Sequence, residues 1–416
     1  MSKKHYLLVM WDGGGAVPPE LAVARRLLEA GNQVSILGEE SMRTEVEAAG
    51  CRFLPYRYAP NRPNRLPESD PFPDWNGQSP FKILHALLYG QATAYARDVV
   101  ESCQENQFDQ VLIDGFLPGA MIGVEAVGKP FSVLWPAIDI IPHAGRPPDG
   151  LGLMPGKDPV SKVRDFLLNQ LFRTILQSGK KEINTLRESY GLSKLKHPFH
   201  QYQKAEKVLI LSSRHFDYPT QLPSNTFYGG PQLTDPHWAE PVELHIPGPY
   251  ILVSLGSTFQ NQKDLYIRLM ETLSQLPLPA VVTLGNVFDP KEFGHYPNIH
   301  ILKAAAHHSL LPECGLVINH GGHGIVMKSI MAGLPQLVIP LGRDQFGNAG
   351  RVVYHGLGMK AKRNSKPEEL ARKIKRLLSD ESFGEKVRLM AEKIKTEITS
   401  DPIGRYLLND QDHLTS

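Results

Sequence analysis

The sequence predicts an α/β protein made of two Rossmann-like domains that face one another across a cleft. Three observations carry this prediction: strand-like apolar runs alternate with helical patterns in the first half, the same alternation starts again in the second half, and a proline-rich segment separates the two. With 416 residues, of which 41% are hydrophobic, the chain is long enough to bury two cores.

The first half opens with a strand, a helix and a second strand. These elements are expected at residues 5–11, 18–31 and 32–38, and Gly31 ends the helix. The pattern repeats with the continuous apolar strands of a parallel sheet that helices cover on both faces, at residues 108–115, 119–128 and 130–135.

Two further segments of the first half have a clear character. Residues 58–81 are rich in Pro, Asn and Asp and predict a surface loop that lines or covers a cleft. Residues 162–191 have helical spacing of Leu, Phe and Ile, which predicts helical structure whose apolar face packs on the sheet.

A proline-rich segment marks the domain boundary. Residues 229–250 contain five prolines, and a compact element rarely tolerates so many in so short a span. We therefore predict domains at residues 1–234 and 235–416. Strand patterns of the second domain fall at residues 250–256, 279–285, 299–304, 314–322 and 335–341, and the tail from Lys366 onward is helical and charged.

The composition excludes several classes of protein. Lys and Arg number 45 against 43 Asp and Glu, without a basic stripe, so no nucleic-acid partner is expected. The three cysteines lie far apart, which argues against a disulfide framework or a CxxC zinc site and fits a reducing cytoplasm. Because no apolar run reaches spanning length, we expect no integral membrane segment and a cytoplasmic location.

The opening loop, "WDGGGAVPPE", sits between a strand and a helix, where a nucleotide is often held. Gly13 and Gly15 fit the dinucleotide fingerprint G-x-G-x-x-G, but Pro18 stands at the third glycine position. Glu39 and Glu40 follow the next strand, as the acidic residue of an NAD site does, so an NAD site stays open as an alternative at this point.

A more specific loop lies in the second half. A strand ends at Asn319, and residues 320–324, "HGGHG", open onto a helix. Glycines let backbone N–H groups approach an anion closely, and the helix N-terminus adds partial positive charge, so the loop predicts a phosphate site to which His320 donates a further hydrogen bond. A zinc site would need the four histidines 307, 308, 320 and 323 to converge without cysteine, and we predict no metal site.

The following strand leads into "GRDQFGNAGR". Asp344 and Gln345 offer a carboxylate and an amide side by side, which is the chemistry that fixes vicinal hydroxyls of a sugar. Since the carboxyl ends of parallel strands meet at one edge of a sheet, phosphate at one loop and polyol at the next predict a nucleotide sugar.

These motifs resemble a known family. The pattern His320-Gly-Gly-x-Gly, Gly333-Leu-Pro335, Pro340 and Asp344-Gln345-x-x-Asn348-Ala349-x-Arg351 resembles the donor-site signature of family 1 glycosyltransferases, the UDP-glycosyltransferase superfamily with the GT-B fold. "ILVSLGST" and "FYGGP" are also similar to bacterial members, including macrolide and antibiotic glycosyltransferases. The resemblance spans essentially the whole chain and implies that the final helices cross back onto the N-terminal domain.

The resemblance implies a role for each donor-site residue. His320 and the backbone at Gly321, Gly322 and Gly324 would hold the diphosphate, and Asp344 and Gln345 the donor sugar. Asn348 would brace the phosphate loop. Ser257 or Thr258 would approach the diphosphate from the other side, with a turn cap after the strand as the alternative for these two hydroxyls.

The chain departs from the family at three donor positions. Ile325 replaces a Thr or Ser, so only its backbone N–H remains for phosphate, and Lys328 replaces a ribose-binding Glu in a helix where a solvated lysine is also expected. Ala305 lies where an aromatic residue stacks on the base, so UDP and dTDP both stay open.

The family also implies a catalytic pair that this chain lacks in part. Members carry Gly-His-x-x-Pro in the first loop, with an Asp that orients the His, whereas this chain has Gly15-Ala16-Val17-Pro18-Pro19. The partner Asp corresponds to Asp114, which becomes the leading candidate for the general base, followed by Asp12 and then Asp139. A bound water, an acidic acceptor or a mere turn-capping role for these carboxylates are the alternatives.

The predicted activity is inverting, metal-independent transfer of a hexose from a UDP- or dTDP-sugar to an apolar small molecule, at oxygen, carbon or nitrogen. The nucleotide sugar is a co-substrate, and no other cofactor is expected. A non-catalytic nucleotide-sugar-binding or auxiliary protein of the same fold, and a nucleotide-sugar epimerase, are the alternatives.

Overall fold

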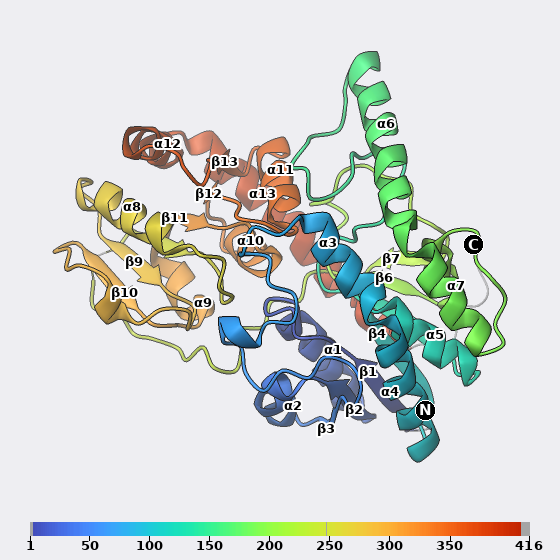
Figure 1. Ribbon diagram of the computed structural model, residues 1–416. Helices are drawn as coiled ribbons and strands as arrows, with labels where there is room; N and C mark the ends of the chain where they lie inside the picture. Colours follow the sequence, from blue (N-terminus) through green and yellow to red (C-terminus); the bar gives the residue numbers. More distant parts are fainter. Residues whose placement is uncertain (1–2, 247, 409–416) are drawn as a thin grey trace.

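The computed structural model describes residues 3–246 and 248–408 and contains two parallel sheets, each with helices on its faces (Figure 1). Seven strands form the first sheet in the order β3-β2-β1-β4-β5-β6-β7: β1 His5–Val9, β2 Gln33–Gly38, β3 Arg52–Pro55, β4 Gln110–Asp114, β5 Phe131–Trp135, β6 Val208–Ile210 and β7 Thr226–Tyr228. Six strands form the second in the order β10-β9-β8-β11-β12-β13: β8 Tyr250–Ser254, β9 Ala280–Thr283, β10 Ile299–Leu302, β11 Cys314–Asn319, β12 Gln336–Val338 and β13 Gly358–Lys360.

The α-helices divide in the same way between the two halves. Those of the first half are α1 Val17–Glu29, α2 Arg43–Ala48, α3 Pro80–His85, α4 Ala92–Glu105, α5 Pro118–Ala126, α6 Pro159–Leu176 and α7 Lys180–Ser189. Those of the second half are α8 Lys263–Ser274, α9 His307–Leu310, α10 His323–Met331, α11 Gln345–Tyr354, α12 Pro367–Ser379 and α13 Glu381–Thr399. None of the helices in these described ranges is long and apolar enough to cross a membrane.

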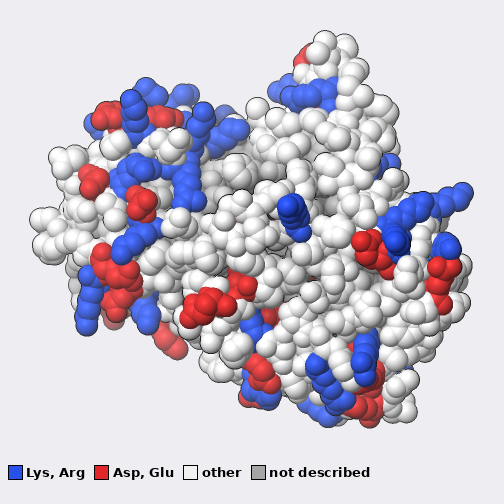
Figure 2. Space-filling view, in the orientation of Figure 1, with Lys and Arg blue, Asp and Glu red and all other residues white. Residues whose placement is uncertain are grey.

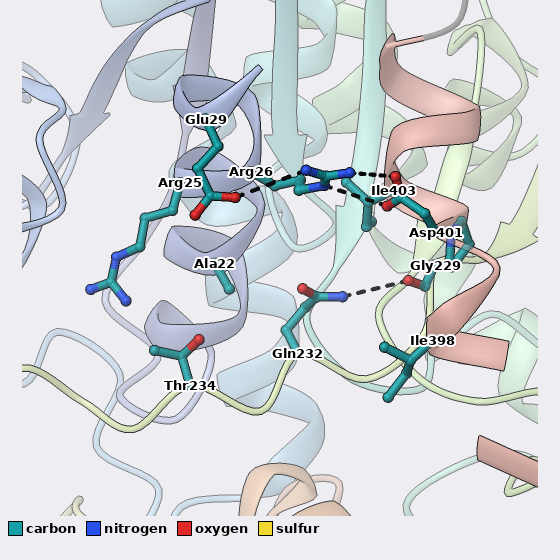
Figure 3. A pocket seen from close by; sticks show the side chains of 11 residues that line it. Ala22, Arg25, Arg26, Glu29, Gly229, Gln232, Thr234, Ile398, Asp401 and Ile403 are labelled. Atoms are coloured by element: carbon teal, nitrogen blue, oxygen red, sulfur yellow. Dashed lines mark hydrogen bonds and ion pairs between the residues drawn. The ribbon is translucent and has the colours of Figure 1, made fainter. Parts of the chain in front are cut away.

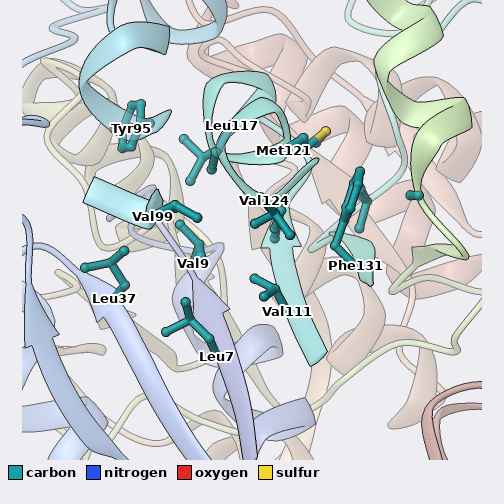
Figure 4. Close-up of a cluster of buried hydrophobic side chains, with 14 of the residues drawn as sticks. Leu7, Val9, Leu37, Tyr95, Val99, Val111, Leu117, Met121, Val124 and Phe131 are labelled. Carbon is teal, nitrogen blue, oxygen red and sulfur yellow. The ribbon is translucent and has the colours of Figure 1, made fainter. Parts of the chain in front are cut away.

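Burial explains why the strands are continuous apolar runs. Each central strand is covered on both faces, and one face of the first sheet packs on α4 and α5 through the side chains in Figure 4, among them Leu7, Val9, Val99, Val111 and Val124. This pattern, repeated in both halves, confirms the predicted fold class of two parallel α/β units.

Strand order places the functional loops. In each sheet the order reverses between two central neighbours, β1 and β4 in the first and β8 and β11 in the second. Ligands of open parallel sheets bind outside the carboxyl ends of the strands at such a switch point. The loop with Asp12, the strand end at Asp114, and the loops after Ser254 and Asn319 all lie at these two places.

The last described residues return to the first half of the molecule. Ile403 and Leu407 are buried among the side chains of β1, β6 and α1, and Tyr6 donates a hydrogen bond from its hydroxyl to the carbonyl of Leu407. Figure 3 shows the junction from close by: Arg26 of α1 pairs with Asp401 at 2.5 Å beside a surface groove. None of the predicted catalytic or donor-binding residues lines this groove.

The predicted domain boundary falls in a long connection. β7 ends at Tyr228 and β8 begins at Tyr250, so residues 234 and 235 lie between the last strand of one sheet and the first strand of the other. We keep the domain limits of 1–234 and 235–416 as a proposal, with residues 401–408 lying on the first unit.

The expectation for residues 162–191 was wrong in one respect. They form two helices, and α6 projects from the body of the molecule at the top of Figure 1. Its apolar residues are largely exposed, with Val160 at 79% and Phe166 at 61%, because the helix extends beyond the sheet that it was expected to cover. On the face that Figure 2 shows, charges of both signs are interspersed with wide uncharged areas.

Candidate active site

The glycine-rich loop after β11 is shaped by its own side chains and backbone. The backbone N–H of Gly321 donates to Oδ1 of Asn319 at 2.8 Å, and Gly321 has a φ of 91°, a conformation that favours glycine. Gly322 then precedes α10, whose first N–H groups have no acceptor within the helix. The loop therefore presents backbone donors and the positive end of a helix dipole to the edge of the sheet.

His320 fits only because two neighbours lack side chains. A Cβ on Gly256 would lie 2.9 Å from Nε2 of His320, and one on Gly322 would lie 2.5 Å from it. Burial lowers the pKa of His320 to about 4, so the ring is neutral at pH 7. Its buried Nδ1 has no hydrogen-bond partner among the described residues, which leaves one ring nitrogen available to a ligand.

Space for an anion lies at the start of α10. A Cβ on Gly324 would meet no heavy atom within 4 Å among the described residues. Ile325 follows with a buried side chain, so its backbone N–H is what it offers at this end of the helix. Ser257 and Thr258 lie in the turn after β8, next to the glycine that makes room for His320.

The sugar-loop residues are tied to the phosphate loop. Nδ2 of Asn348 donates to the carbonyl of Gly321 at 2.9 Å and to Oδ2 of Asp344 at 2.8 Å, so Asn348 links the two loops. Burial raises the pKa of Asp344 to about 6. Gln345 is buried; its Oε1 accepts from the backbone of Leu341 at 2.7 Å and its Nε2 donates to Gln260. In this arrangement the Gln345 amide mainly shapes its own loop.

Lys328 is neither solvated nor free to add charge near a diphosphate. Its ammonium is paired with Asp235 in the connection between the sheets, and its side chain is 10% exposed. Asp235 also accepts from Nδ1 of His308 at 2.8 Å, while Nε2 of His307 lies 3.1 Å from Oγ of Ser254. The sequence did not reveal this cluster of Asp235, His308 and Lys328, because Asp235 is far from the other two in the chain.

The four histidines considered for zinc do not form a site. In the part of the chain that the structure describes, no group of three or more metal-ligating side chains comes together. His323 is buried with its ring 6.2 Å from that of Phe216, away from the partners of His307 and His308. Of the two acidic residues considered for an NAD site, Glu39 is fully buried and accepts from the backbone N–H of Asp12 at 2.8 Å, which argues against that role for Glu39.

The glycines of the opening loop serve contact between the two units. Gly14 has a φ of 68°, and a Cβ there would lie 2.3 Å from Cγ2 of Thr258. Ala16 precedes α1 and is half-buried. The loop that lacks the family histidine thus lies directly against the loop that follows β8.

Asp12 is held by two arginines. Its Oδ2 lies 2.7 Å from Nε of Arg65 and 2.6 Å from Oγ of Ser41, and its Oδ1 lies 3.1 Å from Arg62 and accepts from the backbone N–H of Gly14 at 3.0 Å. Burial alone would raise the pKa of Asp12, but Arg65 and Arg62 outweigh it and lower the pKa. Both oxygens of Asp12 are therefore occupied and the carboxylate binds protons weakly, which argues against Asp12 as the base.

Asp139 is occupied in the same manner. Its Oδ1 lies 3.0 Å from Arg146 and 2.9 Å from Nε2 of His143, and the pKa of the carboxyl is lowered by these charges despite its burial. Arg146 in turn binds Asp217, which also pairs with Arg351 of α11 at 2.7 Å. This buried network links Arg351, the last residue of the donor-site motif, to Asp217 in the segment after β6. The sequence did not show this structural role.

Asp114 lies in different surroundings. It ends β4, is 1% exposed, and its Oδ1 accepts from the backbone N–H of Phe116 at 2.7 Å. Its Oδ2 has no hydrogen-bond partner of ordinary geometry among the described residues. Burial raises its pKa to about 7, which places the group where a general base is most effective at neutral pH.

Glu20 is the residue that sequence reasoning missed. It lies in the first turn of α1 and is fully buried, and burial together with the nearby Asp114 raises the pKa of its carboxyl group well above the usual value. The signal was available: buried Val17, Val23, Ala24 and Leu27 define the core face of this helix, and Glu20 lies among them.

Aromatic side chains surround the end of β4. The Trp11 ring lies 6.0 Å from that of Phe72 and 5.9 Å from that of Phe116, which in turn lies 5.0 Å from Trp135. Trp11 and Phe116 are half-buried. Asp114 therefore stands beside a surface suited to apolar, ring-containing molecules.

Known proteins match both the sequence and this architecture. Residues 268–410 match a family model described as erythromycin biosynthesis protein CIII-like, C-terminal domain. The chain is 24% identical over 407 residues to 4'-demethylrebeccamycin synthase of Lentzea aerocolonigenes, with 94% of each chain covered. Among solved structures it is similar to the kitacinnamycin glycotransferase, with a TM-score of 0.75, 20% identity and 97% and 98% of the two chains covered.

A further solved structure was determined with a nucleotide. The glycosyltransferase VinC, in complex with dTDP, has a TM-score of 0.66 and 18% identity, with 96% of this chain and 98% of that one covered. The structural likenesses establish the fold. UDP-glucuronosyltransferase 3A1 of Bos taurus, which is 26% identical over 306 residues with 69% of this chain and 58% of that protein covered, agrees with the donor-site motif on the activity. The chain is a glycosyltransferase of the GT-B fold that is similar to the bacterial family 1 enzymes.

Proposed function

We propose that the protein transfers a hexose, with inversion at the sugar carbon, from a UDP- or dTDP-sugar to an apolar small-molecule acceptor of the natural-product type. The observation that carries the proposal is the loop at residues 320–324, where a neutral His320, free backbone donors and open space beside Gly324 meet at the start of α10. The dTDP complex of VinC and the name of the rebeccamycin relative support a nucleotide sugar and a small-molecule acceptor.

The donor half fits the charge that develops in transfer. As the bond between the sugar carbon and the diphosphate breaks, negative charge grows on the diphosphate, and the dipole of α10 together with a hydrogen bond from His320 would stabilise it. Asp344, half-buried and linked through Asn348 to the phosphate loop, is the residue that we assign to the sugar hydroxyls. We propose that no metal or further cofactor takes part, since these groups already supply the stabilisation.

The acceptor half supplies an apolar surface and a base. Inversion requires the acceptor to attack the sugar carbon opposite the leaving diphosphate. The contact between Gly14 and Thr258 brings the acceptor-side loop to the donor-side loop, and Asp114 lies beside the aromatic rings of the first unit. We assign Asp114 as the base that takes the proton of an acceptor hydroxyl. The three cysteines are buried and unpaired, which fits the cytoplasmic location that we propose.

The test is mass spectrometry of products formed from UDP-glucose and dTDP-glucose with a panel of phenols, macrolides and simple alcohols. Transfer above a no-enzyme control supports the proposal, and the loss of free nucleotide sugar without a glycosylated product points to hydrolysis instead. Binding without any turnover would favour the non-catalytic alternative, and interconversion of donor sugars would favour an epimerase.

His320→Ala and Asp344→Ala separate the two parts of the donor site. We expect His320→Ala to weaken binding of UDP or dTDP in calorimetry, and Asp344→Ala to reduce turnover more than nucleotide binding. Loss of one hydrogen bond to a buried polar group costs about 1 to 3 kcal/mol. Unchanged affinity and turnover in His320→Ala would remove the diphosphate assignment.

A further inference from the structure

Two buried carboxyl groups meet beneath the loop that lacks the family histidine. Glu20 and Asp114 are 0% and 1% exposed, and each carboxyl group acts on the pKa of the other. Both oxygens of Glu20 and Oδ2 of Asp114 have no other hydrogen-bond partner among the described residues. Carboxylates only accept hydrogen bonds, so a hydrogen bond between these two groups requires a proton on one of them. Two like charges this close and this deeply buried would otherwise repel one another strongly.

No cation of the described residues offsets these charges. The groups that act on the pKa of either carboxyl are the other carboxyl, the backbone N–H of Phe116 and the indole of Trp11, with no Lys, Arg or His among them. The titratable groups that face the pair from other elements are tyrosines, which are neutral at pH 7: Tyr56 after β3, Tyr95 of α4 and Tyr202 before β6. The two arginines of the loop at residues 58–81, Arg62 and Arg65, are bound to Asp12.

Hydrogen bonding decides which carboxyl carries the proton. Asp114 accepts from the backbone N–H of Phe116 at 2.7 Å, which favours a negative charge on Asp114. Neither oxygen of Glu20 has a backbone or side-chain N–H donor among the described residues. Burial and the nearby Asp114 both raise the pKa of Glu20 well above its usual value, so Glu20 is the neutral member at pH 7.

We propose that Glu20 is a positioning residue for the transfer reaction, which as a neutral acid donates a hydrogen bond to Asp114 and holds it as the carboxylate that takes the acceptor proton. This inference rests on the proposed function. In the transfer step the acceptor oxygen bonds to the sugar carbon as its O–H bond breaks. The proton moves to Asp114 and the diphosphate leaves with the electrons of the old bond. Asp114 then returns the proton to water before the next turnover.

The location of the pair explains how an alanine is tolerated at position 16. Ala16 directly precedes α1, and Glu20 lies one turn further along the same helix. The chain thus places an acidic group on Asp114 from the helix that in the resembling family begins beside a histidine. In the resembling family a histidine takes the proton and an Asp orients the histidine. Here Asp114 takes the proton, and Glu20 of α1 orients Asp114.

Three variants test the inference in the full chain without substrate. Glu20→Gln keeps a hydrogen-bond donor of the same shape, Glu20→Leu removes the donor at similar volume, and Asp114→Asn removes the base. The pKa of Asp114 is followed by carbon-detected NMR of protein labelled with ¹³C at side-chain carboxyls. We expect a resonance that titrates near pH 7 in the wild type and is missing in Asp114→Asn. Glu20→Leu should move it upward by about one pH unit or more, and Glu20→Gln should hardly move it.

Activity gives the second readout. With 2-phenylethanol as a weakly acidic acceptor, the inflection of kcat/KM against pH should follow the NMR titration in each variant, and with 4-nitrophenol, which ionises readily by itself, it should not. Transfer by the wild type together with an unmoved Asp114 titration in Glu20→Leu would overturn the inference and leave the proposed function standing. A titration that moves as expected, without transfer to any acceptor of the panel, would overturn the proposed function and the catalytic part of the inference. Glu20→Met replaces Glu20→Leu if the leucine variant does not fold.

Discussion

Asp12 and Asp114 lie at the carboxyl ends of neighbouring strands of one sheet and are both about 1% exposed, yet their surroundings are opposite. Asp12 receives hydrogen bonds on both oxygens and is paired with two arginines, so its pKa is lowered. Asp114 has no cation beside it among the described residues, and burial raises its pKa. Place in the fold makes a carboxylate a candidate base, and the charge of its neighbours decides whether it can act as one.

The loop of residues 58–81 produces much of this difference. It supplies Arg62 and Arg65 to Asp12, and Asp74 from the same loop pairs with Arg343 of the second unit at 2.6 Å. The loop therefore neutralises one carboxylate and connects the two units, while leaving the other carboxylate without a cation. The four predictions below test this contrast, from the largest expected effect to the smallest.

The largest effect is expected for Asp114→Asn. An amide cannot take the acceptor proton, and a general base contributes around 10² to 10⁴ in rate, so turnover on 2-phenylethanol should fall by about that factor. Turnover on 4-nitrophenol should fall much less. Steady-state kinetics on both acceptors measures the contrast, and Asp12→Asn serves as the matched control at the neighbouring strand. Equal losses on the two acceptors would remove Asp114 from the role of base.

Asp12→Asn should instead reduce stability. Removing the carboxylate leaves Arg62, which is 9% exposed at its side chain, and Arg65 short of a partner, and breaking a buried ion pair costs about 3 to 5 kcal/mol. Since Arg62 and Arg65 also reach Glu39 and Glu45, we expect the lower end, about 3 kcal/mol. Urea unfolding near pH 7 measures this loss. A fully stable variant with a large loss of turnover would contradict the structural role.

The contrast also shows what the sequence could and could not predict. The strands, the helix after the opening loop and the loop at 320–324 follow from local patterns of apolar residues and glycines, and they lie where expected. The pairing of Asp12 with Arg62 and Arg65 joins residues 50 and 53 positions apart, and no local sequence pattern indicates it. Lys328 likewise finds Asp235 at a separation of 93 residues. Charged pairs of this kind are set by tertiary contact.

Glu20 was predictable in principle, because an acidic residue on the apolar face of a helix is unusual. What the pattern could not show is the partner. The influence of Asp114 on Glu20 is a tertiary effect. A glutamate that only stabilises the N-terminus of the helix would have the same local sequence.

The third prediction concerns the pH dependence of stability. The folded-state pKa of Glu20 is raised above its ordinary value of 4.5. At pH values between these two pKa values, Glu20 is ionised in the unfolded chain and neutral in the native protein. The free energy of unfolding therefore falls as the pH rises through this range. Glu20→Gln removes this loss. Its free energy of unfolding should exceed that of the wild type at pH 8 by about 1 kcal/mol or more, with little difference at pH 4, since each pKa unit is worth about 1.4 kcal/mol.

Asp12 serves as an internal control, because its effect on the free energy of unfolding changes with pH in the opposite direction. Its folded-state pKa is lowered, so its contribution is present above its ordinary value of 3.8 and is lost as the pH falls. Denaturant unfolding at several pH values from 3 to 8 should therefore give Asp12→Asn and Glu20→Gln changes of opposite sign. Parallel curves for Glu20→Gln and the wild type above pH 5 would show that Glu20 is ionised in the native protein.

The smallest effect is expected for Ala16→His, which restores the family residue. Ala16 is half-buried and directly precedes α1, against the loop that contacts Thr258, so an imidazole there would stand near the acceptor. With Asp114 already acting as base, a gain of about tenfold or less on 2-phenylethanol is expected, because a second base adds little to a reaction that already has one. In the Asp114→Asn background the same change should restore a larger share of the lost turnover. Ala16→Asn, similar in size but unable to take a proton, is the control. If Ala16→His and Ala16→Asn behaved alike in both backgrounds, the space at position 16 would be too far from the acceptor for any base, and the carboxyl pair at the end of β4 would have to act from its own position alone.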